Sequence, residues 1–339
     1  MSDLYPFLMV PIFDERPWGV RDLRPIYTQA VKDPIGEAWL TWEDNRVANG
    51  PLTGRTLSEL SMQYGRDLVG RAAWYEDRFP LLAKFLFTAA KLSVQVHPDD
   101  EQARKAGQPC GKTECWYALA AKPGAQVALG LKPGVTLEGF EQSIHEQRAE
   151  ELLNWVDVRT GDMLYVAAGT VHTIGGGLIL VETQQTSDTT YRLYDYGRPR
   201  ELHIAEGLAA TRLHTNAGIV VRHASDPPDV LLRSPYFQVE KIRLRGPLNA
   251  GVSPASPQIV IATEGAGVVE SPGMEPVSFA TGEAVVIPAA LRNYSLRPQW
   301  ELEIMRMSLP TGAVAEPETV LGQAVGARQE KDLVSPSKR

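Results

Sequence analysis

The sequence predicts a mainly β fold with helical insertions, arranged as two barrel-like units. Runs in which polar and apolar residues alternate, such as 92–97 and 178–184, recur along the chain, and this period of two is typical of half-buried strands. Residues 236–307 contain almost only such runs and turns. A twelve-residue pattern that begins at Gly161 returns from Gly282. The repeat and the length of 339 residues together favour two domains.

Composition narrows the class of protein. The chain is 43% hydrophobic and 22% charged, with a net charge of −7, which argues against nucleic acid or an anionic membrane surface as a partner. The first ten residues lack a basic segment, and no apolar run approaches the roughly 18 residues of a membrane span. Two cysteines, Cys110 and Cys115, are too few for a disulfide scaffold. We therefore expect a cytoplasmic protein.

The first unit is expected at residues 1–225. Its beginning is irregular and strand-rich, and two helical segments follow at about 54–90 and 136–155. Thr56 and Glu59 have the spacing of a capping box, which indicates where the first helix starts. Apolar residues from Leu137 onward recur at helical spacing in the second segment.

The second, smaller unit is expected at residues 226–310, after a linker that contains Pro227 and Pro228. The remaining residues, 311–339, have little apolar periodicity. We expect this tail to be partly disordered.

The stretch LSVQVHPDD, from Leu92 onward, carries the first candidate site residues. In a strand, Gln95 and His97 lie on the same face because side chains two apart share a face. The next strand brings Glu114, and a later strand opens with His172. Two imidazoles, a carboxylate and an amide from three strands form a plausible metal site. Such ligands suit zinc, and also iron, manganese or nickel.

Two lysines and a cysteine lie near these ligands in the sequence. Lys112 is two residues before Glu114 and shares its strand face, whereas Cys115 faces the opposite side. Lys84 sits within an apolar segment, where it either extends to solvent or reaches into a site. Residues 107–113 resemble a phosphate loop, but the spacing is one residue short and a strand follows, so we reject a nucleotide site.

Residues 161–172 resemble the second sequence motif of cupins, with Ala167 where proline is usual. Gln95 and His97 correspond to the histidine pair of the first cupin motif, and Glu114 to its glutamate. This resemblance implies that the first unit is a metal-bearing jelly-roll barrel.

The second occurrence of the pattern runs from Gly282 through Pro288 and Ala290 to Asn293. Asn293 stands where the first occurrence has His172. We therefore expect the second unit to be a degenerate cupin-like jelly-roll barrel that has lost its metal.

Three longer blocks resemble a particular family, the type I mannose-6-phosphate isomerases, or phosphomannose isomerases, in their short bacterial form. The blocks are FPLLAKFLFTAAKLSVQVHPDD, GKTECWYAL and GDMLYVAAGTVHTIGGGLILVETQQTSDTTYRLYDYGR, and the likeness covers about residues 5–310. It implies an enzyme with one Zn²⁺ per chain that interconverts mannose 6-phosphate and fructose 6-phosphate through an enediol(ate). Its partner would be a small molecule, a hexose 6-phosphate.

The resemblance also assigns residues to roles. It places the zinc ligands on Gln95, His97, Glu114 and His172. It places the phosphate-binding cations on Arg192, Lys112 and Lys84, and an acid-base carboxylate on Glu182. Ring opening needs a further proton carrier, for which Asp188 is suited, so the catalytic set is Arg192, Glu182, Lys112 and Asp188.

Two other functions are compatible with a cupin barrel. One is a sugar-phosphate-binding cupin without catalysis, which would bind its ligand without turnover. The other is an iron oxygenase, against which Gln95 argues, because histidine is usual at that position. Some long members of the isomerase family carry a histidine where this chain has Gly111, so proton transfer here is expected from Glu182 or a zinc-bound water.

Overall fold

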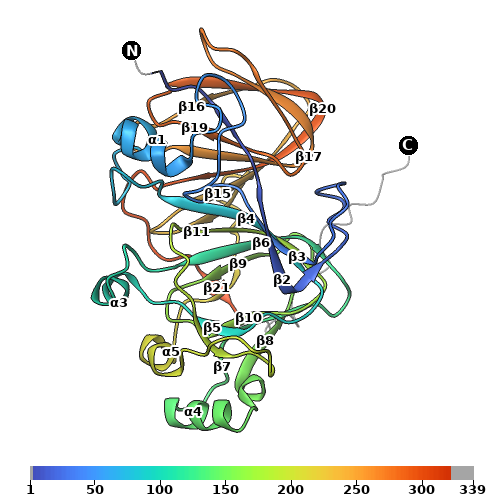
Figure 1. Cartoon of the computed structure of the whole chain (residues 1–339), viewed down its shortest axis with the longest axis vertical. Helices are drawn as coiled ribbons and strands as arrows, with labels where there is room; N and C mark the ends of the chain where they lie inside the picture. The colour runs from blue at the N-terminus through green and yellow to red at the C-terminus, as the bar shows by residue number, and fades with distance from the viewer. Residues whose placement is uncertain (1–2, 322–339) are drawn as a thin grey trace.

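Three antiparallel β-sheets form the framework of the computed structural model, which describes residues 3–321 (Figure 1). We call them the upper, middle and lower sheets after their places in Figure 1. The upper sheet has the order β1 (Phe7–Met9), β19 (Ala284–Ile287), β17 (Gln258–Glu270), β20 (Asn293–Ser308), β15 (Gln238–Leu244) and β14 (Val230–Arg233), with β16 (Leu248–Gly251) on β20 and β18 (Val277–Ala280) on β17.

The other two sheets lie below it. The middle sheet runs β2 (Ile12–Val20), β3 (Ile35–Trp39), β4 (Leu81–Thr88), β11 (Leu178–Gln185), β6 (Glu114–Ala121), β9 (Met163–Val166), β13 (Gly218–Val220) and β21 (Thr319–Val320). The lower sheet runs β12 (Tyr191–Tyr194), β5 (Val94–Val96), β10 (His172–Ile174), β7 (Gln126–Leu131) and β8 (Leu153–Asp157). The helices are α1 (Leu57–Tyr64), α2 (Arg66–Val69), α3 (Asp100–Lys105), α4 (Leu137–His145), α5 (Ile204–Ala210) and the 3₁₀ turn η1 (Ala149–Leu152).

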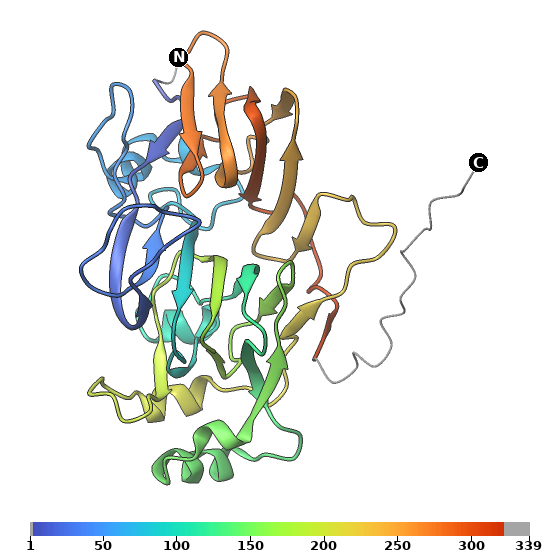
Figure 2. The same ribbon diagram turned by 90° about the vertical axis from the view of Figure 1, so that its right-hand side faces the viewer.

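The middle sheet is covered on both faces, and the sheets stack as layers in Figure 2. Phe85, Cys115 and Val181 pack in the core shared with the upper sheet. Leu86 and Leu180 pack in the core shared with the lower sheet. Because successive side chains of a strand alternate in direction, the even-numbered residues of β4, β6 and β11 face the lower sheet. The prediction that Cys115 faces away from Glu114 is confirmed.

The expected helical segment at 54–90 was wrong in its second half, because Leu81–Thr88 forms strand β4. All eight residues of β4 are buried. A strand covered on both faces shows an unbroken apolar run, which periodicity cannot distinguish from a buried helix. The start of α1 is as predicted, with a capping box formed by Thr56 and Glu59. The second segment is helical only to Leu152, and β8 then begins.

Sheet membership crosses the expected boundary at residue 225 in both directions. Strand β1, near the start of the chain, pairs with β19, so that Phe7 lies opposite Val286. Strand β21, within the expected tail, pairs with β13, so that Val320 lies opposite Ile219. The rest of that tail, residues 322–339, lies outside the described residues.

The repeated sequence pattern has a repeated local structure. Gly161 and Gly282 both have positive φ, 94° and 89°, a conformation that favours glycine. A short strand follows each of them, β9 or β19, and the next strand begins at His172 in one repeat and at Asn293 in the other. We call residues 161–172 the first repeat and residues 282–293 the second repeat.

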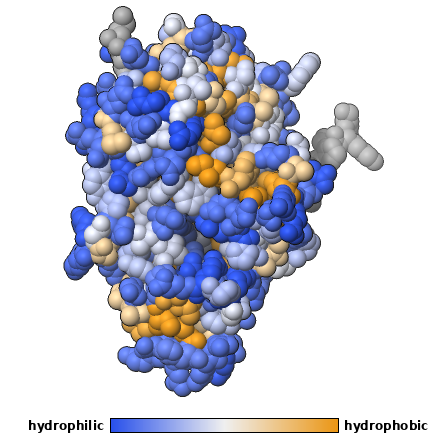
Figure 3. Space-filling model, in the orientation of Figure 1, coloured by the Kyte–Doolittle hydropathy of each residue, from blue (hydrophilic) through white to orange (hydrophobic). Residues whose placement is uncertain are grey.

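The surface in Figure 3 is mainly hydrophilic, with apolar residues gathered in a patch near its lower end and in a band above its middle. The most exposed large apolar side chain among residues 3–321 is Trp300, at 91%. Within the same range, no helix has the length and apolar character needed to cross a bilayer.

Candidate active site

The candidate site lies between the middle and lower sheets, where each sheet contributes a row of polar side chains. In the lower sheet, Gln95 is the register partner of His172 on one side and of Arg192 on the other. These three residues therefore lie side by side on neighbouring strands and share one face. His97 follows just beyond the end of β5.

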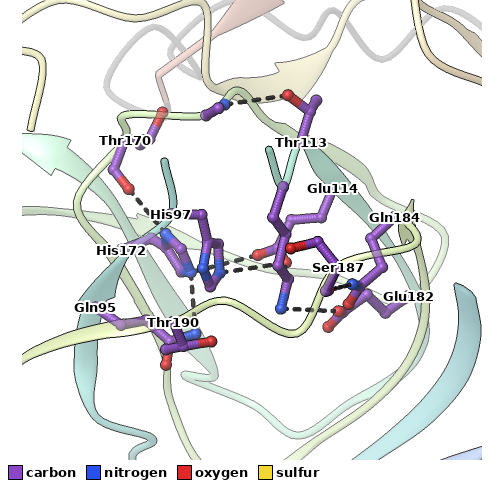
Figure 4. Close-up of polar contacts among 12 residues, drawn as sticks. Gln95, His97, Thr113, Glu114, Thr170, His172, Glu182, Gln184, Ser187 and Thr190 are labelled. Carbon is purple, nitrogen blue, oxygen red and sulfur yellow. Dashed lines mark hydrogen bonds and ion pairs between the residues drawn. The ribbon is translucent and has the colours of Figure 1, made fainter. Parts of the chain in front are cut away.

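The middle sheet supplies the second row by the same rule. Glu182 lies in β11, between β4 and β6. Its register partners are Lys84 in β4 and Trp116 in β6. Glu114, two residues before Trp116, shares its face. Lys112 precedes β6 and reaches the same place, since its Nζ lies 3.3 Å from Glu114 Oε2. Figure 4 shows the acidic and imidazole side chains converging between the sheets.

Three of the predicted metal ligands form a tight buried group. His97, Glu114 and His172 are each at most 1% exposed, and one ligand atom from each lies within 4.8 Å of the others. His97 Nε2 is 3.5 Å from Glu114 Oε2, and His172 Nε2 is 3.3 Å from Glu114 Oε1. Two imidazole nitrogens and a carboxylate facing one point are a donor set that binds divalent metals.

The second nitrogen of each imidazole is occupied by backbone. His97 Nδ1 lies 2.9 Å from the carbonyl oxygen of Thr189, and His172 Nδ1 lies 2.9 Å from that of Thr170. A carbonyl can only accept, so each Nδ1 carries the proton and each Nε2, which lies near Glu114, keeps a free lone pair. His97 Nε2 and one oxygen of Glu114 are buried without a hydrogen-bond partner among the described residues. These atoms fit a metal ion.

The electrostatic setting keeps both imidazoles neutral. Burial, with Lys112 and His172 nearby, holds the pKa of His97 well below its ordinary value. Burial lowers the pKa of His172 to about 4. Neutral imidazole is the form that donates a lone pair to a metal.

Gln95 lies beside this group but presents its amide nitrogen to it. Nε2 of Gln95 is 3.1 Å from His172 Nε2, while Ser93 Oγ donates to the amide oxygen at 3.2 Å. A half-turn of the amide would exchange these two atoms and direct the oxygen at the centre, with Ser93 Oγ then accepting from the nitrogen. The assignment of Gln95 as a ligand stays a prediction.

A chain of alternating charges leads away from the metal-binding group. Lys112 Nζ lies 3.3 Å from Glu114 and 3.9 Å from Glu182. Lys84 Nζ lies 3.2 Å from Glu182 and 3.0 Å from Glu37. All five of these side chains are buried, so each charge is balanced by its neighbours rather than by water.

Burial and neighbouring charges pull the two outer carboxylates in opposite directions. Burial raises the pKa of Glu182 to about 7 in spite of Lys84. Burial would also raise the pKa of Glu37, but Lys84 and Arg16 outweigh it and lower that pKa to about 2. Burial alone would lower the pKa of Lys84, yet Glu182 and Glu37 raise it. Glu182 is thus the carboxylate that can exchange a proton near neutral pH.

One cavity of about 350 Å³ connects these groups. Its lining includes every predicted site residue except the two histidines, which lie behind Glu114: Lys84, Gln95, Lys112, Glu114, Glu182, Asp188 and Arg192. The sequence-based assignment therefore brought together residues that are close in space. Asp188 is exposed at the cavity's edge, whereas Lys84 and Lys112 are buried within it.

Arg192 has a guanidinium that is only partly used by the protein. Its Nη1 donates to the carbonyl oxygen of Glu201 at 2.8 Å, and its Nε is buried without a partner among the described residues. No carboxylate of residues 3–321 lies within ion-pair distance of it. Asp195, the nearby candidate, instead pairs with Arg198 and Arg200.

Several cavity residues were not predicted from the sequence. Glu37 and Arg16 extend the charge chain, with Arg16 Nε 3.0 Å from Glu37, and Arg200 lines the cavity. Trp18 also lines the cavity. Glu37 has no local sequence signal, because its place in the site follows from the pairing of β3 with β4.

Fold and site together define an enzyme of the cupin type with a buried His–Glu–His metal-binding group. Residues 18–142 match the family model described as "Phosphomannose isomerase type I, catalytic domain". The chain is 36% identical to mannose-6-phosphate isomerase ManA of Bacillus subtilis (strain 168), over 86% of this chain and 95% of that protein. It is 35% identical to the probable mannose-6-phosphate isomerase GmuF of the same organism, over 71% of this chain and 81% of GmuF.

A crystal structure of the Bacillus subtilis mannose 6-phosphate isomerase superposes with a TM-score of 0.77 at 30% identity, covering 88% of this chain and 99% of that one. The chain belongs to the type I phosphomannose isomerase family. This confirms the resemblance found in the sequence, and with it a mainly β fold and a small-molecule substrate.

Proposed function

We propose that this enzyme interconverts mannose 6-phosphate and fructose 6-phosphate through an enediolate, with one Zn²⁺ per chain, in the cytoplasm. The observation that supports the proposal is that Glu182, whose pKa burial raises to about 7, lines the same cavity as Glu114 of the buried group His97–Glu114–His172. Lys112 lies between the two carboxylates. The buried free thiols of Cys110 and Cys115 are consistent with a reducing compartment.

Proton transfer is assigned to Glu182. An aldose–ketose isomerisation moves a proton between C2 and C1, so the group that carries it must both take and return it. A carboxyl whose pKa is about 7 is suited to both directions near neutral pH. Asp188, at the edge of the cavity, is proposed to exchange the proton that opens the sugar ring.

Charge develops on the sugar oxygens when the proton leaves carbon. Lys112, 3.9 Å from Glu182 and 3.3 Å from Glu114, is a buried cation that could stabilise that charge. Lys84 holds Glu182 from the other side at 3.2 Å. Both ammonium groups are already paired with buried carboxylates, so we place the phosphate on Arg192 rather than on the two lysines.

The metal would be held by His97, Glu114 and His172, with Gln95 as a fourth ligand after its amide turns. When bound, the divalent cation supplies Lewis-acid stabilisation of negative charge on the substrate oxygens. Zinc is proposed because it combines readily with imidazole and carboxylate ligands in four-coordinate sites.

The test is a coupled assay of mannose 6-phosphate isomerisation on native, metal-stripped and zinc-restored protein. We expect stripping to abolish turnover and zinc to restore it without oxygen present. Binding of hexose 6-phosphate without turnover in the zinc-loaded protein would favour a non-catalytic sugar-phosphate-binding cupin. A requirement for iron and oxygen would favour an oxygenase.

A further inference from the structure

The phosphate of a hexose 6-phosphate carries about two negative charges near pH 7, and Arg192 supplies one positive charge. The two lysines of the cavity are committed elsewhere, since Lys84 lies between Glu37 and Glu182, and Lys112 lies near Glu114. Without a second available cation, one negative charge of the phosphate would remain unbalanced in a chain whose net charge is already negative. The cavity lining contains one more guanidinium without an assigned role, that of Arg200.

Arg200 is held rigidly by a buried carboxylate. Its Nε donates to Asp195 Oδ2 and its Nη2 to Asp195 Oδ1, both at 2.7 Å, while Asp195 is only 3% exposed. Such a two-point contact fixes the plane of the guanidinium. It leaves Nη1 of Arg200 without an acceptor among residues 3–321. The side chain is therefore oriented before any ligand arrives, and it keeps free N–H groups.

The charges around it leave a local positive excess. Asp195 is shared between Arg200 and Arg198, whose Nη1 lies 3.1 Å from Oδ1, so two guanidinium groups face one carboxylate. Arg192 adds a third guanidinium group, and no carboxylate of the described residues lies within ion-pair distance of Arg192. Burial and the neighbouring Arg200 both lower the pKa of Arg192, as expected for like charges held close together. Asp188 also lines the cavity, and its negative charge offsets part of the excess.

We propose that Arg200 is a second phosphate-binding residue of this site, with Asp195 as the residue that positions it. The inference rests on the proposed function and specifies how the dianion is held. Arg192 and Arg200 would each direct unused N–H groups at the phosphate, while the sugar extends toward Glu182 and the metal-binding group.

Arg198 provides a matched control, because it shares Asp195 with Arg200 but does not line the cavity. We compare Arg200→Met with Arg198→Met by the KM for mannose 6-phosphate, the inhibition constant of inorganic phosphate and the melting temperature. In Arg200→Met, we expect both constants to rise about tenfold or more, as for loss of a hydrogen bond to a charged group, with kcat changed less than about threefold. In Arg198→Met, both constants should stay within about twofold of wild type.

A lysine variant and a direct binding measurement complete the test. Arg200→Lys should recover part of the phosphate affinity, since an ammonium keeps the charge but not the fork. Equal changes in the two methionine variants, accompanied by equal losses of melting temperature, would assign Arg200 only a structural role and overturn the inference. So would unchanged constants in Arg200→Met. Calorimetry of inorganic phosphate binding needs no turnover, so it tests Arg200 even if wild type fails as an isomerase, which would defeat the proposed function alone.

Discussion

The two repeats share their strand geometry and differ in their donors. In the first repeat, His172 lies opposite Gln95, whereas in the second repeat Asn293 lies opposite Gly251. The first pair offers an imidazole and an amide to one point. The second offers one exposed amide facing a residue without a side chain.

The position that supplies the carboxylate ligand also differs between the two repeats. Glu114 lies opposite Val166 in the first repeat, and Gln258 lies opposite Ile287 at the corresponding position of the second. Gln258 accepts a hydrogen bond from Tyr294 at 2.6 Å, so its amide serves the core. The cavity beside Asn293 is the larger, at about 620 Å³ against 350 Å³. We therefore expect the charge and type of the donors, rather than the space available, to decide which repeat binds a metal.

The largest expected effect comes from removing a donor that only the first repeat has. His172→Ala should lower the metal content from one ion per chain to none. Because changes to outer-shell partners already cost 10- to 100-fold, we expect loss of a ligand to lower kcat by about 1000-fold or more. Metal analysis and the coupled assay measure both. Asn293→Ala is the control and should retain metal and turnover; two ions per wild-type chain would break the comparison.

Anion binding should also occur only beside the first repeat, because Arg192 lies on β12, which pairs with β5 next to Gln95. The strand β16, which lies opposite Asn293 of the second repeat, pairs only with β20 among the described strands. Arg192→Ala should lower kcat/KM by somewhat over 100-fold, which corresponds to a loss of about 3 kcal/mol of transition-state stabilisation. Arg192→Lys should recover only part. Slow activity on unphosphorylated mannose should hardly change. Parallel loss of both activities with a lowered melting temperature would mean that Arg192 is structural.

Proton transfer can be separated from metal binding with a near-isosteric change. Glu182→Gln should lower kcat by about 100-fold, the usual scale for a general acid-base group, while the metal content stays at one. Near-normal turnover would return Glu182 to the role of an ordinary strand residue in β11.

The buried charges of the middle sheet contrast with the exposed ion pairs of the upper sheet. The folded-state pKa of Glu37 is about 2 against an ordinary value of 4.5. A depressed carboxyl pKa gives stability above pH 4.5 that is lost as the pH falls toward 2. Glu37→Gln should cost about 2 kcal/mol of unfolding free energy at neutral pH and flatten the acid dependence in this window. Chemical denaturation between pH 2 and 7 tests this.

Glu264 of the upper sheet provides the matching control, since its pair with Arg243 is largely exposed. Glu264→Gln should change the unfolding free energy by less than about 1 kcal/mol. An equal loss in Glu264→Gln and Glu37→Gln would remove the contrast between the two sheets.

The smallest effect is expected from restoring a single donor to the second repeat. Asn293→His should bind no additional metal, because Gly251 and Gln258 still provide neither an amide ligand at the first position nor a carboxylate at the second. Metal content and kcat should match wild type. A second bound ion would show that one histidine suffices in this geometry.

Sequence reasoning predicted the residues whose spacing is local. Gln95 and His97 share a face by the strand period, and His172 ends a pattern with characteristic glycines. Lys84 was left open, because its destination depends on the strand opposite, where Glu182 is its register partner. A local sequence pattern around Lys84 does not show which residue lies opposite it in the neighbouring strand.

The same limit explains the residues that were missed. Glu37 belongs to the site because β3 pairs with β4, and Arg200 because Asp195 orients it across an irregular segment. The strand β4 was mistaken for helix since both of its faces are covered. These features arise from long-range packing, which composition and periodicity do not encode.

Strand β1 has a consequence for how the chain is made. Phe7–Met9 leave the ribosome well before their partner strand β19, which is synthesised about 280 residues later. The upper sheet cannot close until β19 has emerged, and contacts of such high sequence separation form slowly. Likewise, a fragment cut near residue 225 would take β1 away from the sheet that needs it and leave β13 without β21. Each half would then expose an unpaired strand edge, open to association with other chains.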